Sequence, residues 1–398
     1  MKVFKVKVYF LSGILILTIP VLQFVVNTKY KFPEPHPFKG EYLYNPYKGM
    51  DSRKWEMANF HTHGRIFFGL TAGAANSDQF IDSLYKYFNY NIISISNYQS
   101  INKFESKNKW FVPVYEHGYQ YYKNHQLVIN AKKVTWLDFF FRQTLNNKQS
   151  IIDHLKKDPS VILTIVHPGP RKAYPPDDFK YLSNYDCLEI ASGKDALTSY
   201  YDTILSAGHP VFLMANDDAH DLRKINDGCH SFNMINTDLI KDSILYSIKT
   251  GRLIGVNFNA GPYETNEEKK SGMQKLPEIT SVTLMDDTLI ISLNKLVKAI
   301  KFIGQKGAER KKITNAAMGS YFINKQDTYI RTEIECYDGT IYFLNPVLRY
   351  NGVQLPDHVS SPDLFKTWLC RSVFLFILVL IFTIMRIRNK SLLKRTTI

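Results

Sequence analysis

Residues 55–260 alternate short apolar runs with stretches that have the apolar periodicity of helices. Most runs are continuously apolar, which is typical of strands buried on both faces of a parallel sheet. Residues 77–90, with Ser77 as the expected N-cap, and 240–250 are the clearest helical stretches. This alternation predicts an α/β fold, and its length favours a TIM-like barrel. The expected strands include residues 91–96, 110–115, 161–166, 186–191 and 210–215.

The pattern changes after Gly261. Residues 263–275 are polar and are expected to form a linker. Short segments of alternating polarity follow, with turn signals at 286–287 and 338–339, and they predict a small all-β sandwich over residues 277–350. The sandwich carries no chemical motif, so we interpret it as a structural or docking module.

Apolar runs lie at both ends of the chain. Residues 8–27 are long enough to cross a hydrocarbon core of ~30 Å, and residues 367–386 reach that length if Arg371 extends to the interface. Lysines precede the first run and a basic cluster follows the second, which predicts cytoplasmic ends and an extracytoplasmic body at the cell membrane. A cleavable signal peptide for the first run and a buried core helix for the second remain alternatives.

The formal net charge of +14 is unevenly distributed. Residues 1–40 hold six Lys and one Glu, and residues 366–398 hold seven Lys or Arg without an acidic residue. The body between them is nearly neutral, whereas a nucleic-acid interface requires basic residues gathered on one face of a domain. We therefore expect a lipid bilayer as a partner and no nucleic acid.

Histidines and acidic residues follow several of the expected strands. His61 and His63 are two residues apart, as are Asp218 and His220, so each pair can point to one side of an extended chain. Glu116 and His167 each come directly after an apolar run. In a parallel barrel these positions converge at one rim, which predicts a metal site. The alternative is a set of hydrogen-bonded core histidines.

The motifs His61-Thr62-His63, Glu116-His117-Gly118, NHQLVINA, VHPG, CLEIASG and DDAH occur in the order 61, 116, 124, 166, 187 and 217. In this order they resemble the polymerase-and-histidinol-phosphatase (PHP) family of metal-dependent phosphoesterases. The resemblance covers about half of the chain and implies a distorted (β/α)7 barrel, which agrees with the pattern above.

The resemblance also implies a ligand set for two divalent ions. The first ion would be held by His61, His63, Glu116 and Asp218. Glu116 would bridge to a second ion bound also by His125 and His167, with His117 as a rival to His125. Glu189 matches an acidic position of the family, and its role could be either a structural hydrogen bond or catalysis. Mixed His and carboxylate ligands suit Zn, Mn or Fe.

The sequence departs from the family at two positions. Gly69 stands where a His or Asp is frequent, and residues 96–98 read Ser-Asn-Tyr in place of Thr-Asp-His. Two ligands of a third metal are therefore missing, and we expect a binuclear site. This frees His220 for a general-acid or phosphate-contact role, or for a hydrogen bond beside the ligands.

The implied reaction is hydrolysis of a phosphoester by a hydroxide formed from a bridging water. Charge on the phosphoryl oxygens needs cationic help, for which Arg171 and Arg223 are candidates. Arg65 is a third candidate but is as well explained as a solvated surface residue. The expected substrate is a phosphorylated small molecule or a cell-envelope phosphoester.

Two other function classes remain open. An amidohydrolase-type amide or ester hydrolase also begins with an HxH motif, but it would use a bridging lysine and no DxH pair. A catalytically weakened PHP-like module that binds metal without turnover would account for the substitutions at Gly69 and Asn97-Tyr98.

Overall fold

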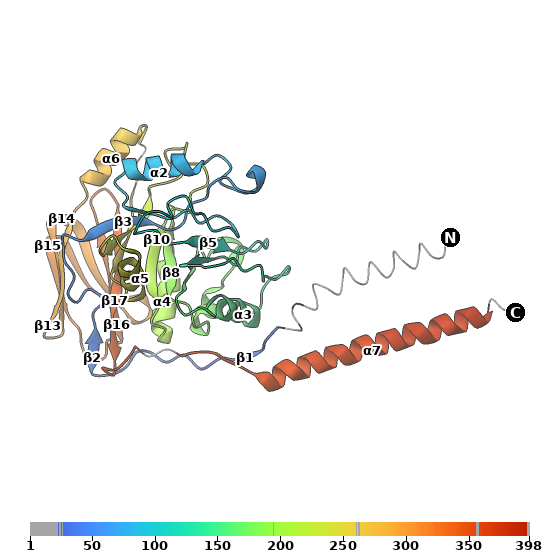
Figure 1. The fold of residues 1–398 in the computed structure, drawn as a ribbon. Helices are drawn as coiled ribbons and strands as arrows, with labels where there is room; N and C mark the ends of the chain where they lie inside the picture. The colour runs from blue at the N-terminus through green and yellow to red at the C-terminus, as the bar shows by residue number, and fades with distance from the viewer. Residues whose placement is uncertain are drawn as a thin grey trace.

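The computed structural model describes residues 23, 25, 27–193, 195–259, 261, 263–355 and 358–395. Two large β-sheets with helices packed around them form the body, and a long helix, α7, extends away from it (Figure 1). The predicted N-terminal membrane segment, 8–27, lies almost entirely outside the described residues.

A six-stranded sheet lies in the half of the body nearer α7. Its order is β10-β8-β7-β6-β5, with β9 paired to β8. β8 runs parallel to β7 and β10, whereas β6 is antiparallel to both β5 and β7. The strands are β5 (Val114–His117), β6 (Gln126–Ile129), β7 (Ile162–Ile165), β8 (Cys187–Ser192), β9 (Asp195–Ala196) and β10 (Phe212–Asn216).

A ten-stranded sheet forms the other half. Its order is β13-β14-β16-β17-β12-β11-β3-β4, with β15 on β14 and β2 on β17. β12 pairs with β17 in the register Ile254↔Leu344, so C-terminal strands directly continue the sheet that holds β3. The strands are β2 (Tyr42–Tyr44), β3 (Trp55–Asn59), β4 (Ile92–Ile93), β11 (Ser231–Asn236), β12 (Leu253–Asn257), β13 (Ile279–Met285), β14 (Thr288–Gly304), β15 (Ala308–Phe322), β16 (Tyr329–Glu335) and β17 (Ile341–Tyr350).

The predicted fold class is wrong. The strands do not form a TIM-like (β/α)7 barrel, because they divide between two sheets in which many neighbours are antiparallel. The expected β-sandwich is also not a separate unit, since its strands extend the ten-stranded sheet. Continuous apolar runs indicate burial on both faces of a sheet, but they do not fix strand direction.

The connections between strands decide the direction. Only residues 118–125 join β5 to β6, which is too short for the crossover that parallel neighbours require. The antiparallel β5–β6 pair follows from this short connection.

Helices cover the sheets. As predicted, α2 (Asp78–Tyr87) begins after Ser77, whose side chain accepts a hydrogen bond from the backbone N–H of Phe80. The segment expected as a polar linker instead contains α6 (Asn266–Gln274), capped by Thr265 and Glu268. The other α-helices of the body are α3 (Leu145–Leu155), α4 (Thr198–Ala207) and α5 (Lys241–Lys249), and the short 3₁₀ turns are η1 (Phe67–Gly69), η2 (Pro170–Lys172), η3 (Pro176–Lys180) and η4 (Gln305–Gly307).

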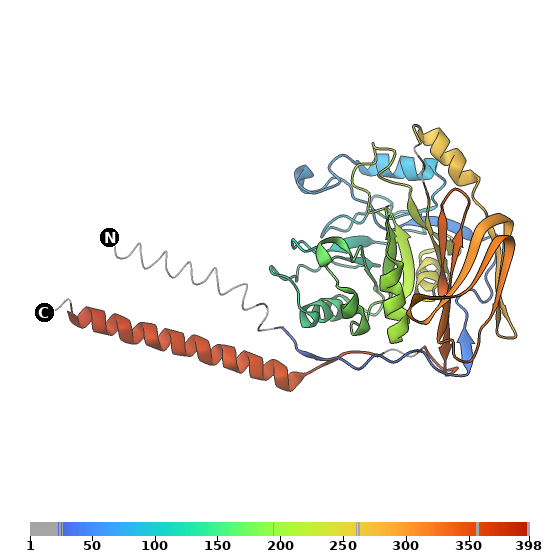
Figure 2. The ribbon, with the colours of Figure 1, turned by 180° about the vertical axis from the view of Figure 1, so that it is seen from behind.

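The two ends of the body are joined. β1 (Tyr30–Lys31) pairs antiparallel with β18 (Ser361–Pro362), immediately before α7 (Leu364–Arg395). Residues 364–387 of α7 contain an 18-residue window with a mean hydropathy of 2.4, and none of this window is buried in the body. By length and composition this helix can cross a membrane, and it contains the predicted 367–386 span. Figure 2 shows α7 leaving the side of the body opposite the outer strands β14 and β15.

Candidate metal centre

The predicted metal ligands lie together where strands of the two sheets end. His61 and His63 follow β3, and Asp218 follows β10. An isolated parallel bridge between Thr62 and Ala219 places the HxH and DxH motifs side by side. A second bridge, from Tyr98 to Glu116, brings the end of β5 to the same place.

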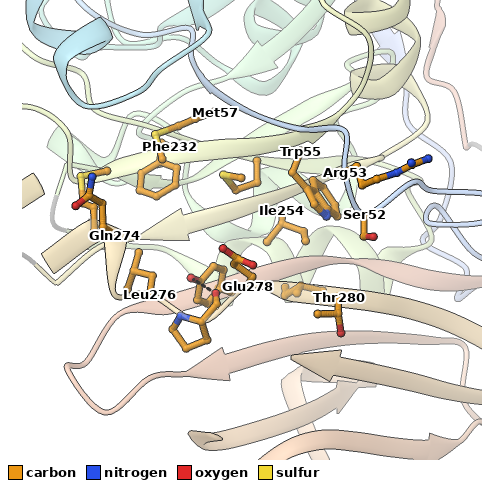
Figure 3. A pocket seen from close by; sticks show the side chains of 15 residues that line it. Ser52, Arg53, Trp55, Met57, Phe232, Ile254, Gln274, Leu276, Glu278 and Thr280 are labelled. Atoms are coloured by element: carbon orange, nitrogen blue, oxygen red, sulfur yellow. Dashed lines mark hydrogen bonds between the residues drawn. The ribbon is translucent and has the colours of Figure 1, made fainter. Parts of the chain in front are cut away.

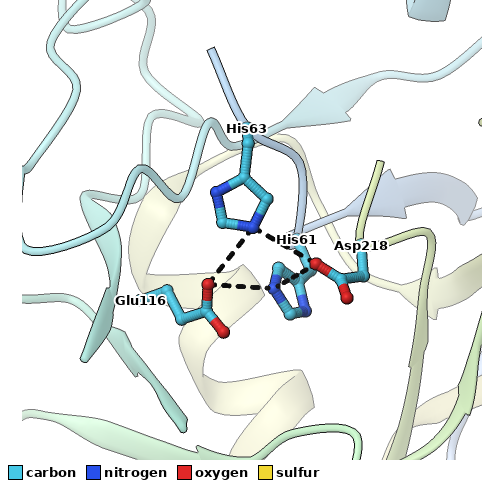
Figure 4. Close-up of side chains that lie close together, drawn as sticks. All are labelled: His61, His63, Glu116 and Asp218. Carbon is cyan, nitrogen blue, oxygen red and sulfur yellow. Dashed lines mark hydrogen bonds and ion pairs between the residues drawn. The ribbon is translucent and has the colours of Figure 1, made fainter. Parts of the chain in front are cut away.

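The first ligand group consists of His61, His63, Glu116 and Asp218 (Figure 4). Asp218 Oδ1 lies 3.1 Å from His61 Nε2 and 3.2 Å from His63 Nε2. Glu116 Oε2 lies 3.2 Å from His63 Nε2 and 3.6 Å from His61 Nε2. Four donor atoms therefore surround one point, as the ligands of a single metal ion do.

The second ligand group consists of Glu116, His125 and His167. Here the other carboxylate oxygen is used: Glu116 Oε1 lies 2.6 Å from His125 Nδ1 and 3.0 Å from His167 Nε2. Each oxygen of Glu116 thus faces a different group of histidines. This is the geometry of a carboxylate that bridges two ions.

Three buried atoms of the first ligand group make no hydrogen bond of good geometry among the described residues. These are His61 Nε2, His63 Nδ1 and Glu116 Oε2. Buried polar atoms are normally paired, because leaving one unpaired costs about 1–3 kcal/mol. The unpaired atoms and the mixed imidazole and carboxylate donors fit Zn, Mn or Fe.

Glu189 fixes the orientation of His61. Its Oε1 lies 2.9 Å from His61 Nδ1 and accepts a hydrogen bond from the Asn216 side chain at 3.0 Å. Its Oε2 accepts the backbone N–H of His167 at 3.1 Å. With Nδ1 engaged in this way, His61 presents Nε2 to the first ligand group, which supports the structural role considered for Glu189.

The charges of the centre are strongly coupled. Burial disfavours the imidazolium of His61, but the carboxylates of Asp218, Glu189 and Glu116 outweigh burial and hold its pKa well above the usual value. Burial likewise opposes ionisation of Glu116, yet the surrounding histidines hold its pKa well below the usual value. Protons on the histidines balance the carboxylate charge, and divalent cations can take their place.

His220 lies at the open edge of the centre, with 32% of its side chain exposed. Its ring stacks on that of His63 at 4.6 Å between centroids, and its Nε2 lies 3.4 Å from Asp218 Oδ1. Tyr98 stacks on His63 at 4.3 Å, in the place where the family motif has a metal ligand. Burial lowers the pKa of His220 to about 4, so its imidazole is neutral at pH 7.

The three candidate arginines make other contacts. The Arg171 guanidinium lies 4.0 Å from the ring centroid of Tyr121 and donates to that residue's carbonyl. Arg223 pairs with Asp221 at 2.7 Å on the surface, and Arg65 donates to the carbonyl of Ala74 at 2.8 Å. Among the contacts of the described residues, none joins these arginines to either ligand group.

The rival ligand His117 points elsewhere. Its Nδ1 lies 2.7 Å from Gln126 Oε1 and its Nε2 lies 2.9 Å from the carbonyl oxygen of Leu137. Both ring nitrogens are therefore engaged by protein groups. Asn97, at another departure from the family pattern, accepts the backbone N–H of Gly64 at 2.8 Å.

Asp217 is a site residue that the sequence analysis missed. Its buried carboxylate accepts five hydrogen bonds of 2.8–2.9 Å, from the backbone N–H groups of residues 229, 230 and 231 and from the side chains of Asn59 and Tyr85. It thereby holds the loop that carries Asp218. The sequence signal that could have indicated Asp217 is the pair of adjacent aspartates, Asp217 and Asp218, directly after a predicted strand.

A pocket of about 550 Å³ with both polar and apolar lining residues lies away from the metal centre (Figure 3). Trp55, Met57, Phe232 and Ile254 line it from the ten-stranded sheet, and residues 273–280 close it. No residue of either ligand group lines this pocket.

Comparison of the chain with protein-family models and with curated proteins gives no match.

Proposed function

We propose that this chain is a membrane-anchored, metal-dependent phosphoesterase with a binuclear centre. The main support for the proposal is that the two carboxylate oxygens of Glu116 face different histidines. Its Oε2 faces His61 and His63, and its Oε1 faces His125 and His167. The order of the motifs, which is that of the PHP family, is the second support. The proposed likeness to the PHP family concerns the arrangement of metal ligands and does not extend to the family's barrel fold.

The residues of the chain have distinct tasks in this proposal. Glu116 and Asp218 supply negative charge that would hold two divalent ions, and Glu189 keeps His61 in the binding orientation. Two bound ions at such a centre lower the pKa of a water molecule and stabilise charge on phosphoryl oxygens. The burial of His61, His63 and Glu116 keeps these charges out of bulk solvent, where electrostatic interactions are weaker.

His220 is suited to contact the substrate. It is the most exposed histidine of the centre and is neutral at pH 7, so one ring N–H can donate to a phosphoryl oxygen. Arg171 and Arg223 would have to leave their present partners to reach the same oxygens. We therefore assign the first contact to His220.

The body is proposed to lie outside the cytoplasm. α7 ends in a basic segment that includes Arg386 and Arg388, and basic residues next to a membrane span remain in the cytoplasm. The metal centre would then meet phosphoesters of the cell envelope.

The test is metal analysis of the full chain together with turnover of a generic phosphomonoester and a generic phosphodiester. We expect about two ions per chain and metal-dependent turnover. His61→Ala should lose an ion and abolish turnover, whereas His154→Ala, in α3, should retain both. A chain that retains metal but hydrolyses neither ester would favour the metal-binding module, and a chain without metal or turnover would refute both.

A further inference from the structure

Large apolar side chains are exposed on three loops that follow strands of the metal centre. The loops are residues 64–75, 118–124 and 131–143, here called the membrane-side loops. Phe68 is completely exposed, and Leu70 is 87% exposed. The other large exposed side chains of these loops are Phe67, Tyr119, Tyr121, Trp136, Leu137, Phe140 and Phe141.

These loops border the metal centre. His117, the neighbour of Glu116, has its Nε2 2.9 Å from the carbonyl oxygen of Leu137. The backbone N–H of Tyr119 donates to Asp138 at 3.0 Å. On the opposite edge, the Asn76 side chain donates to the carbonyl oxygen of His63 at 2.8 Å, which fixes the end of the first loop.

Loop 131–143 also contacts the N-terminal apolar run. The side-chain amide of Gln23 donates to the carbonyl of Asp138, and its oxygen accepts the backbone N–H of Phe140, both at 3.2 Å. Nearby, the backbone N–H of Lys29 donates to Thr367 in the first turns of α7. The exposed aromatic side chains of loop 131–143 therefore lie beside the end of the N-terminal apolar run.

The views from both sides agree with this placement. The loop between β3 and α2, and the segments after β5, lie on the side of the body from which α7 extends (Figures 1 and 2). Strands β14 and β15 lie on the far side.

A bilayer is the occupant that fits this surface. Exposed aromatic groups beside basic ones, such as Lys133 and Arg142, are the composition of a membrane interface. Soluble proteins rarely leave many large apolar side chains exposed next to one another, and such patches mark protein or membrane interaction sites. Loop 131–143 also contacts Gln23 of the N-terminal apolar run, and Lys29, which follows that run, contacts Thr367 of α7.

We propose that the membrane-side loops enter the bilayer interface and that the metal centre acts on phosphoesters carried by membrane amphiphiles. The inference rests on the proposed phosphoesterase function for its substrate, and on the loops alone for its orientation. A phosphate head group at the interface would reach the centre between these loops, while its apolar chains stay in the lipid.

The orientation is tested on the full chain in phosphatidylcholine nanodiscs. Phe140→Cys and Phe322→Cys form a matched pair, because each side chain is 56% exposed, one in loop 131–143 and one at the end of β15. Cys370→Ser removes the one free cysteine of the described residues that is not buried. A polarity-sensitive dye at position 140 should be quenched by spin-labelled lipid, and the same dye at position 322 should not.

Equal quenching at the two positions would overturn the orientation. Shielding of position 140 that requires an added protein instead of lipid would assign the surface to a protein partner and would also overturn it.

The substrate class is tested with phosphatidic acid in vesicles and with glycerol phosphate in solution. The variant Trp136→Ser/Phe140→Ser/Phe141→Ser should lower turnover of the lipid by about tenfold or more, because apolar burial drives interfacial binding. Its metal content and its turnover of glycerol phosphate should not change. The control, Met318→Ser/Phe322→Ser, should leave both reactions intact.

Failure of the two proposals can be distinguished. If glycerol phosphate is hydrolysed as well as the lipid and the loop variant affects neither, the membrane-borne substrate is refuted and the phosphoesterase stands. If neither ester is hydrolysed and no metal is bound, the phosphoesterase is refuted, while dye quenching still decides the orientation.

Discussion

Asp217 and Asp218 are adjacent, yet their carboxylates serve different structures. Asp218 lies in the first ligand group, within 3.2 Å of His61 and His63. Asp217 is turned away and is surrounded by hydrogen-bond donors of the chain. One acidic residue shapes the loop so that the other can face the histidines.

Asp217→Asn should destabilise the protein by about 3 kcal/mol, because either orientation of the amide directs its NH₂ group at N–H donors. Urea unfolding of the metal-free chain measures the loss. Asp221→Asn, which removes surface pairs with Arg223 and Lys224, should leave the stability almost unchanged. Equal losses in the two variants would contradict the role of Asp217.

Glu189→Gln should weaken metal binding without unfolding the chain. The amide cannot accept on both sides as the carboxylate does, so His61 loses its fixed orientation, an effect of about 10- to 100-fold on affinity. Competition with a chelator measures the affinity. Glu335→Gln, at a surface pair with Lys298, is the control and should bind metal normally.

Metal binding should release protons near neutral pH. Burial opposes protonation of His61, His63 and His167, but the neighbouring carboxylates raise the pKa of each above 6.5. In the metal-free chain this contributes stability that is complete below pH 6.5 and is lost as the pH rises through the raised values. Metal must displace these protons, so affinity should fall as the pH is lowered.

Calorimetry in buffers of different ionisation enthalpy counts the protons. Heats that do not depend on the buffer would show that the histidines are already neutral, which contradicts the pKa directions. His61→Ala should release fewer protons than the unaltered chain.

At the scale of elements, the pairing of β12 with β17 joins the two halves of the sequence. β12 lies between β11 and β17, so the strands after residue 277 cover an edge that would otherwise be open. Leu344 and Tyr342 bring buried side chains to this junction.

A chain that ends at residue 259 should therefore fail to fold. It would expose the β12 edge and the apolar surface beneath β17, and it should show no cooperative thermal transition and retain no metal. A chain of residues 28–365, which keeps β1 and β18, is the control. A folded, metal-retaining 1–259 fragment would show that this part of the chain folds without the strands that follow it.

The sequence predicted the position of many elements but not their pairing. β16 occupies Tyr329–Glu335, within the segment 277–350 whose alternation predicted strands, and α2 begins after Ser77 as its cap predicted. α6 was missed because its composition is polar, although Thr265 and Glu268 have the spacing of a capping box. β15 was missed because most of its side chains are exposed.

The candidate site was more predictable than the fold. Alternation along an extended chain places His61 and His63 on one side whatever the direction of the neighbouring strand. The contacts of Arg171 and Arg223 depend on loop conformation, which no local pattern specifies. Glu189 was matched to an acidic position of the family from the sequence, but only the structure shows its hydrogen bonds to His61 and His167.

At the scale of the whole molecule, both ends of the body leave at one place. β1 pairs with β18, the backbone N–H of Tyr30 donates to Asn146, and that of Lys29 donates to Thr367. The helix α7 thus extends from one side of the body, and β14 and β15 lie on the far side.

The β1–β18 pair has a kinetic consequence. In the proposed orientation, a body held at two neighbouring points could not roll freely, so its metal centre would stay at a fixed height above the membrane. The encounter rate with the proposed membrane-borne substrate would then be set by the mole fraction of substrate in the leaflet and not by its bulk concentration. Diluting the substrate with inert lipid should slow such a site, whereas diluting the whole suspension with buffer should leave the rate per molecule unchanged.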